Sequence, residues 1–300
     1  MRTVEITYRC GDDAAAERLR PADADAARRR MDDGNRAFAD LFAQVDVLSA
    51  TSRRVIPISG QDFGLGEAGA SAPAQRPYAA VLGCADARVP IELIFSEGPN
   101  DLFVVRVAGN TLGDDVRGSL KYALEHLGES LRLVAVLGHS GCGAVTAAVD
   151  VFLDPAGYLA LSSKHSIRML VDRLQIVVQA SARKMQDTFG SEITRHAHYR
   201  EALIEVAVVT NAAIAAHMLQ QEISADAAGG MGSVRTVYGV YLLDERLVWA
   251  PRIGSDEVTG LATPPSDAQG FVEFSNAVLR SQRISALLAV QTPSRSVLGL

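Results

Sequence analysis

The chain has 300 residues, a formal net charge of −6 at pH 7 and a hydrophobic fraction of 48%. Such a composition is typical of a globular protein with a sizeable core, and the acidic balance disfavours nucleic acid as a partner. We find no run near the ~18 apolar residues that a membrane span needs, and no apolar core of a signal peptide at the start. We therefore expect a cytoplasmic protein that contacts neither membranes nor nucleic acid.

The first half of the chain predicts one helix, three buried strands and a second helix. Residues 1–20 have no assigned element. The spacing of apolar side chains predicts a helix over residues 21–50, with a face made by Phe38, Leu41, Phe42 and Val45. Residues 57–76 are rich in Gly, Pro, Ser and Ala and predict a loop. Runs rich in Val and Leu, as in strands covered on both faces, occupy 78–83, 102–107 and 131–137. A helix over 116–127, capped by Gly128, is expected between the last two.

The second half predicts long helices and an edge hairpin. Helices are expected over 162–188, 192–222 and 271–290, and a hairpin over 234–243 and 246–250. The alternation of strands and helices predicts an α/β fold. In this fold a central, mostly parallel sheet is flanked by helices, with an N-terminal helical arm and a C-terminal edge hairpin. We divide the chain into an extension over 1–33 and a single domain over 34–300.

Three residues in two short segments have the character of zinc ligands. Cys84 follows the first strand, and His139 and Cys142 follow the third strand. The carboxyl ends of parallel strands meet at one edge of a sheet, so these side chains are expected to converge. Two thiolates and one imidazole suit Zn²⁺, and a set of three leaves one tetrahedral position open, as in catalytic zinc sites.

Other interpretations of these residues stay open. The chain has only three cysteines, which does not indicate a secreted disulfide framework, although a Cys84–Cys142 disulfide is compatible with the sequence. The glycine-rich turn around His139 could cradle a phosphate, although it lacks a phosphate-loop motif. Cys142 could also be a nucleophile with His139 as its base, although no third orienting group is evident.

Two charged residues follow the first ligand. Asp86 and Arg88 lie two and four positions after Cys84. Two thiolates cancel the charge of the metal, so the metal acidifies a bound water less than it would with three imidazoles. A carboxylate held by an arginine could help to select the hydroxide. A simple loop salt bridge is the alternative.

These motifs together resemble the beta-class carbonic anhydrases. The family motif, Cys-x-Asp-x-Arg followed by His-x-x-Cys, stands here as CADAR at 84–88 and HSGC at 139–142. Similar family segments are GNRAF at 34–38, QRPYAAVLGCADARVP at 75–90, FVVRVAGN at 103–110 and LKYALEHL at 120–127. The third of these departs from the family pattern FVVRNxAN.

The resemblance implies a carbonate dehydratase (EC 4.2.1.1), which hydrates CO₂ reversibly to bicarbonate and a proton. Zinc-bound hydroxide would attack CO₂, and Cys84, His139 and Cys142 would hold the Zn²⁺. The family pattern makes Asp86 and Arg88 catalytic. It also matches Gln75 to a glutamine that donates a hydrogen bond to substrate, and Phe103 and Tyr122 to apolar substrate-pocket positions that subunits often share. A homodimer or an assembly of dimers is implied.

The same motifs are compatible with two other functions and bear on one regulatory property. The same zinc chemistry could hydrolyse carbonyl sulfide or carbon disulfide, or the chain could be a zinc-binding regulator without activity. Some family members bind bicarbonate at a regulatory site that includes a Trp and an Arg. Arg106 matches that arginine, but Val81 replaces the tryptophan, which argues against the regulatory site. The region 150–200 carries three further histidines, of which any on the surface could relay protons: His165, His196 and His198.

Overall fold

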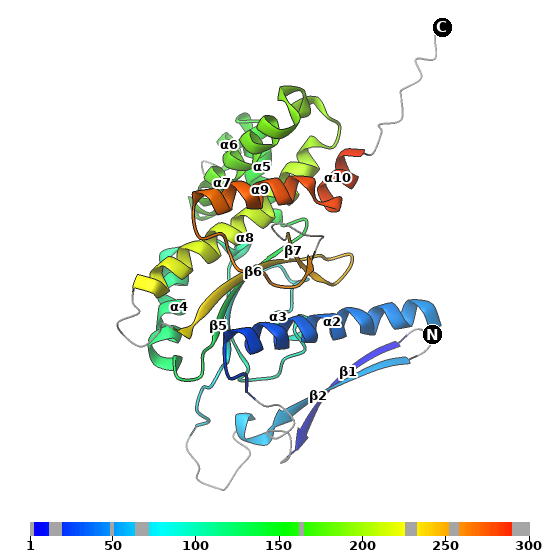
Figure 1. Cartoon of the computed structure of the whole chain (residues 1–300), viewed down its shortest axis with the longest axis vertical. Helices are drawn as coiled ribbons and strands as arrows, with labels where there is room; N and C mark the ends of the chain where they lie inside the picture. Colours follow the sequence, from blue (N-terminus) through cyan, green and yellow to red (C-terminus); the bar gives the residue numbers. More distant parts are fainter. Residues whose placement is uncertain are drawn as a thin grey trace.

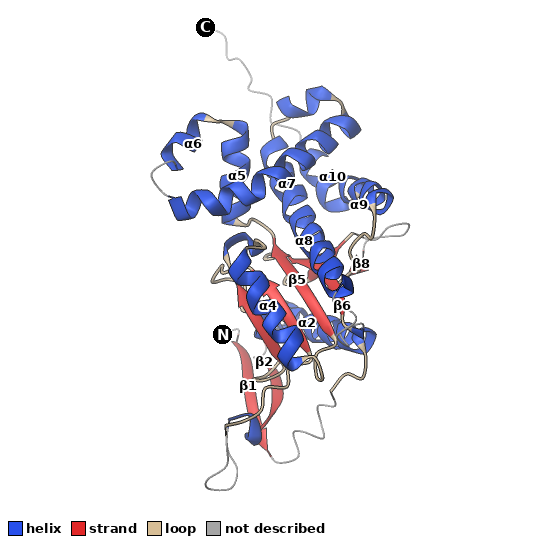
Figure 2. Ribbon diagram, turned by 90° about the vertical axis from the view of Figure 1, so that its left-hand side faces the viewer, coloured by secondary structure: helices blue, strands red, loops and turns tan. Residues whose placement is uncertain are grey.

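The protein is described from a computed structural model, which covers residues 3–11, 20–48, 51–63, 72–161, 165–225, 233–251 and 258–289. Within these ranges a six-stranded sheet lies at the centre, and a separate two-stranded sheet lies below helix α2 (Figure 1). Most of the remaining helices gather on the opposite side of the central sheet (Figure 2). The expected α/β architecture is confirmed.

The central sheet has the strand order β4-β3-β5-β6-β7-β8. The first four strands run parallel: β4 (Leu102–Arg106), β3 (Ala79–Gly83), β5 (Leu133–His139) and β6 (Arg235–Tyr241). Strands β7 (Val248–Ala250) and β8 (Val258–Thr259) continue the sheet in antiparallel pairing. The predicted hairpin is therefore present as β6 and β7. Both of its strands lie inside the sheet, because β8 and not the hairpin forms the edge.

Alternate residues of the buried strands enter two different cores. Ala80 and Leu82 of β3 belong to a large core with the helices of one face, whereas Ala79 and Val81 belong to a smaller core on the other face. Because helices cover both faces, these strands are uniformly apolar instead of alternating. The large core includes residues of α4 (Asp114–Leu127), α5 (Gly143–Leu153), α7 (His165–Phe189), α8 (Tyr199–Ala225) and α9 (Ala268–Arg280). Helix α6 (Ala156–Leu161) follows α5.

The smaller core lies under α2 (Ala24–Leu48) and the short α3 (Ile91–Ile94). Phe38 and Leu41 are buried, Phe42 is half-buried, and the side chain of Val45 lies outside the described residues. Helix α2 is also fixed by polar contacts, because Arg30 forms a 2.6 Å ion pair with the buried Glu97. The helix passes through residue 33, so it crosses the proposed boundary between extension and domain. That division stays a prediction.

The N-terminal extension contributes a strand that was not expected from the sequence. Strand β1 (Thr3–Gly11) pairs in parallel with β2 (Thr51–Ser59), and α2 connects them. The loop expected over 57–76 was wrong at its start, where β2 ends and the 3₁₀ helix η1 (Gly60–Phe63) follows. The signal in β1 is an alternation in which Val4, Ile6 and Tyr8 are apolar and their neighbours are polar.

The C-terminal region forms two helices where one was expected. Helix α9 ends at Arg280, and α10 (Gln282–Ala289) begins after Ser281, whose backbone is extended. The Ser281 hydroxyl donates to the carbonyl of Val278 and so bonds to the last turn of α9. This break turns α10 back toward α8, which it contacts.

Among the described residues, α8 is the one helix that is long and apolar enough to cross a membrane. No stretch of this kind was expected from the sequence. Of its most apolar window, 72% is buried inside the protein, and buried core helices pass the same test, so this is weak evidence for a membrane span. Helix α8 packs against β5 and β6.

Candidate metal centre

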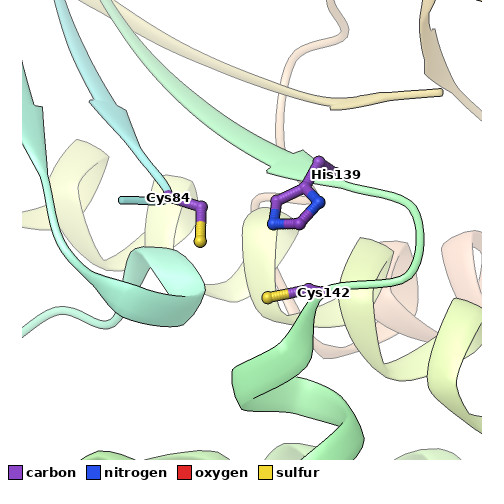
Figure 3. Close-up of side chains that lie close together, drawn as sticks. All are labelled: Cys84, His139 and Cys142. Carbon is purple, nitrogen blue, oxygen red and sulfur yellow. The ribbon is translucent and has the colours of Figure 1, made fainter. Parts of the chain in front are cut away.

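Cys84, His139 and Cys142 converge at the carboxyl ends of two neighbouring strands (Figure 3). Cys84 directly follows β3, His139 is the last residue of β5, and Cys142 is the N-cap of α5. Their potential ligand atoms all lie within 4.8 Å of one another. All three residues are buried, with exposed fractions of 4% or less. Within the described part of the chain this is the only group of His, Cys, Asp or Glu residues with such geometry.

The imidazole of His139 is oriented toward the cluster with one nitrogen free. Its Nδ1 lies 3.0 Å from the carbonyl oxygen of Ser140, which acts as an acceptor and so places the ring proton on Nδ1. The other nitrogen, Nε2, is buried and has no hydrogen-bond partner. A buried polar atom without a partner is costly, and a metal ion would satisfy it. The donor set and this unpartnered atom both fit Zn²⁺.

The surroundings of the two thiols favour the thiolate form of Cys84 even without metal. A hydrogen bond from the Cys142 thiol lowers the pKa of Cys84, although burial opposes this effect, and backbone N–H groups such as that of Gly109 lower it further. The Cys84 thiolate and burial in turn raise the pKa of Cys142. Both cysteines are free thiols, so the alternative Cys84–Cys142 disulfide is not present in the structure. A divalent cation would favour the second deprotonation, since thiolates are the ligands that zinc binds.

Asp86 and Arg88 form the bidentate pair that their spacing predicted. The Nε and Nη2 atoms of Arg88 donate to the two carboxylate oxygens of Asp86 at 3.0 and 2.8 Å. These hydrogen bonds hold the pKa of Asp86 well below its usual range, so the carboxylate stays ionised. One of its oxygens lies 3.8 Å from Nε2 of His139, which places the carboxylate beside the cluster.

Arg106 holds the backbone on either side of Ala85. Its Nε donates to the carbonyl of Cys84 at 3.0 Å, and its Nη2 donates to the carbonyl of Asp86 at 2.6 Å. Val81 stands in the place of the tryptophan of a regulatory anion site, so the sequence argues against such a site at this arginine. The structure shows that the guanidinium instead supports the segment that carries the first ligand. Sequence reasoning missed this role because backbone carbonyls leave no trace in the residue pattern.

The segment from His139 to Cys142 is supported from two other elements. Gly141 has a φ of +61°, a left-handed conformation that glycine adopts without strain. Its N–H donates to Oε1 of Glu205 in α8 at 3.1 Å. The hydroxyl of Ser140 accepts from the N–H of Leu243 at 3.0 Å, which ties the segment to the end of β6. A carboxylate at this turn disfavours phosphate, so the phosphate-cradle alternative loses its support.

The structure places the three predicted substrate-binding residues in two different surroundings. Gln75 and Phe103 line one cavity of about 400 Å³ beside β4, the edge strand, and none of the three candidate metal ligands lines it. Tyr122 is exposed on α4, where its ring stacks on His126 with centroids 4.5 Å apart. The structure therefore brings Gln75 and Phe103 together, and their role toward substrate stays a prediction.

The additional histidines also lie outside the cluster. His165 begins α7, where its Nδ1 is 3.3 Å from a nitrogen of Arg168. The rings of His196 and His198 have centroids 6.0 Å apart, in the connection before α8. None of these residues belongs to the cluster that could hold a metal, and a proton-relay role for them stays a prediction.

Comparisons with known proteins agree with these motifs. The family model described as carbonic anhydrase matches residues 79–241, which is more than half of the chain. Carbonic anhydrase 2 of Mycobacterium tuberculosis is 38% identical over 136 residues, which cover 44% of this chain and 61% of that protein. A carbonic anhydrase of Mycolicibacterium smegmatis is 46% identical over 89 residues, covering 29% of this chain and 42% of the relative. The chain thus spans less than two thirds of the length of these relatives.

Two solved structures are also similar. The beta-carbonic anhydrase CcaA is 26% identical, with a TM-score of 0.48, and the match covers 62% of this chain and 85% of that one. A Coccomyxa beta-carbonic anhydrase is 21% identical, with a TM-score of 0.48 and coverages of 79% and 88%. The family model extends from the first strand of the central sheet to β6 and includes both ligand segments. The chain belongs to the beta-class carbonic anhydrases.

Proposed function

We propose that this protein is a zinc-dependent carbonic anhydrase that hydrates CO₂ reversibly to bicarbonate and a proton. The observation that carries the proposal is the buried Cys84–His139–Cys142 cluster, with an unpartnered Nε2 on His139. Zinc held there would lower the pKa of a coordinated water and so supply a nucleophile near neutral pH. The 38% identity with Carbonic anhydrase 2 of M. tuberculosis supports this reaction class.

The residues beside the cluster have separate tasks in the proposed reaction. With zinc bound, the carboxylate of Asp86, which lies 3.8 Å from Nε2 of His139, would accept a hydrogen bond from the attacking oxygen and orient its lone pair toward CO₂. Arg88 keeps Asp86 ionised, because its two hydrogen bonds favour the carboxylate form. Arg106 fixes the backbone around Ala85, so the carboxylate and the Cys84 thiolate keep their relative positions.

The wall of the substrate site is proposed to come from a second subunit. Gln75 and Phe103 sit together at the open edge strand β4, not at the cluster of their own chain. A homodimer across this region would bring them to the partner's metal centre, where the amide could bond substrate and the ring could supply an apolar wall for CO₂. Tetrameric beta-carbonic anhydrases of Sordaria macrospora are among the similar structures. We also propose a cytoplasmic location, because a reducing compartment keeps the thiols free.

Stopped-flow hydration of CO₂ with a pH indicator tests the proposal directly, at about pH 8, where a zinc-bound water would be ionised. The zinc-loaded protein should accelerate the reaction above the buffer rate, and His139→Ala or Cys142→Ser should lose both zinc and activity. A zinc-loaded wild type without acceleration would overturn the proposal. Activity toward carbonyl sulfide or carbon disulfide alone, in the same assay, would do so in favour of the related hydrolase.

A further inference from the structure

Two polar side chains stand out on the apolar helix α8. Its most apolar window has a mean hydropathy of 1.7, yet Glu205 and Asn211 both point to backbone near the candidate metal ligands. They are six residues apart, which corresponds to about 9 Å along a helix axis. Polar groups in such a helix weaken its burial unless they make specific hydrogen bonds. We propose that Glu205 and Asn211 are positioning residues that hold the two ligand segments in register for zinc. This inference rests on the proposed zinc site.

Glu205 joins the segment of His139 and Cys142 to the C-terminal helix. Its Oε1 accepts the N–H of Gly141 at 3.1 Å, and its Oε2 accepts from Nε of Arg283 at 2.8 Å. Arg283 belongs to α10, so three distant parts of the chain meet at this carboxylate. The Glu205 side chain is only 14% exposed, and an ionised acceptor makes a stronger hydrogen bond than a neutral one. The turn between the two ligands is thereby fixed from outside.

Asn211 supports the other ligand through one intermediate residue. Its Nδ2 donates to the carbonyl of Gly109 at 2.9 Å, and the N–H of Gly109 donates to Sγ of Cys84 at 3.3 Å. Gly109 has a φ of +67°, and a Cβ there would come within 3.0 Å of Ala144. The N–H of Gly109 is therefore held toward the sulfur of Cys84, and a larger side chain at position 109 would disturb this arrangement. Such N–H···S bonds stabilise the thiolate form that binds the metal.

The chain offers a matched control for Glu205. Glu201 lies one turn earlier on α8 and lines the same cavity of about 870 Å³ as Glu205 and Arg283. Its carboxylate is 47% exposed and lies 3.7 Å from Arg200, far from ideal hydrogen-bond length. Loss of Glu201 therefore removes an equal charge from the same helix and cavity without removing a bond to the ligand segment.

Zinc release into an excess of chelator distinguishes positioning from general stability. Glu205→Ala should release zinc roughly 10-fold faster than wild type, which is the usual scale for loss of an outer support to a metal ligand. Glu205→Gln keeps an acceptor for Gly141 and should restore most of the retention, although it loses the ion pair with Arg283. Asn211→Leu, of similar size, should also release zinc faster. Glu201→Ala should match wild type.

Two further measurements on the same variants make the outcome decisive. Hydrogen exchange of residues 138–143 should accelerate in Glu205→Ala, with or without zinc, and stay slow in Glu205→Gln. The midpoint of urea unfolding measures the stability of each variant. If zinc-release rates rose in proportion to the loss of stability in both Glu201→Ala and Glu205→Ala, the inference would be overturned. Equal release from wild type and folded Glu205→Ala would overturn it too. Wild type that bound no zinc would contradict the proposed function, whereas exchange in the metal-free chain would still test the hydrogen bond.

Discussion

The chemistry of individual side chains sets the candidate site apart from the rest of the core. Cys84 and Cys142 are as buried as the aliphatic residues around them, and His139 is completely buried. Buried thiols are usually inert, and a buried imidazole normally uses both nitrogens. Here one nitrogen lacks a partner and the pKa of Cys84 is lowered by its neighbours. Each of these residues alone would be an ordinary buried residue. The three together differ from the rest of the core because they form a potential metal site.

Replacement of Asp86 by asparagine separates metal binding from catalysis. Asp86→Asn should keep zinc, because the residue is not one of the three ligands, but it should lose about 10² or more of the CO₂ hydration rate, the scale of a positioned proton acceptor. Zinc content by elemental analysis and rates by stopped-flow measure the two effects. Full activity in the zinc-loaded variant would show that Asp86 has no role in the reaction.

The Asp86–Arg88 pair also predicts a change in acid stability. Hydrogen bonds from Arg88 lower the folded-state pKa of Asp86 below the unfolded value of about 3.9. The pair therefore stabilises the folded chain above about pH 4, and this contribution is lost as the pH falls. The metal-free Arg88→Gln variant should thus lose less stability than wild type between about pH 6 and pH 3. Urea midpoints at both pH values measure this, and equal losses would contradict it. The effect should be small, since the pair is partly exposed.

At the scale of elements, the contact between α2 and the turn after α3 depends on one glycine. Gly34 lies where α2 crosses the turn after α3, and an added Cβ would overlap the carbonyl oxygen of Phe95. The hydroxyl of Ser96 donates to the Gly34 carbonyl at 2.9 Å, so the two backbones are held at this close approach. The sequence places a glycine in a helix, where it is normally unfavourable, and the structure supplies the reason.

Gly34→Ala should therefore destabilise the protein by about 1–3 kcal/mol, the cost of overpacking a rigid contact. Gly118 provides the control, because it is exposed in α4 and a Cβ there would meet no atom within 4 Å. Gly118→Ala should stabilise by about 0.5–1 kcal/mol through helix propensity. Urea unfolding measures the change in the free energy of unfolding of both variants. Equal changes of the same sign would show that the contact at Gly34 is not tight.

The elements that the sequence predicted well are those with one dominant signal. Strands β3 and β5 are uninterrupted apolar runs, and α4 has a clear helical pattern, so each could be located from residue types alone. Strand β1 has an alternating apolar and polar pattern. It pairs with β2, nearly 50 residues away, and no local feature of the sequence indicates that partner. The break at Ser281 depends on a side-chain hydrogen bond to the preceding turn, so a single helix was the simpler expectation.

At the scale of the whole molecule, the proposed dimer predicts complementation between two inactive variants. Cys142→Ser lacks the metal site but keeps Gln75, whereas Gln75→Ala keeps the metal site but lacks the amide. If the partner supplies Gln75, a mixed dimer contains one site with both parts intact. Mixing and refolding the two variants should then restore activity above that of either alone, measured by stopped-flow CO₂ hydration.

The oligomeric state provides the control for this experiment. Light scattering of the wild type should give the mass of a dimer or a multiple of it. A monomer, or mixed dimers without recovered activity, would show that Gln75 does not complete a partner's site.

The ligands could be predicted from sequence and their supports could not. Cys84, His139 and Cys142 are rare residue types at the ends of recognisable strands, so chemistry and position agree. Glu205, Asn211 and Arg106 act through backbone atoms of other segments, and any residue can supply a backbone carbonyl or N–H. Only the packing of α8 and β4 shows which backbone groups they reach.

The distribution of these supports along the chain has a consequence for synthesis. All three ligands lie before residue 143, but Glu205, Asn211 and Arg283 follow much later. A growing polypeptide would present both thiols and the imidazole well before α8 and α10 could pack behind them. Stable metal capture is therefore expected only after nearly the whole chain has left the ribosome. Stable zinc binding would then follow the folding of α8 and α10 and would not initiate folding.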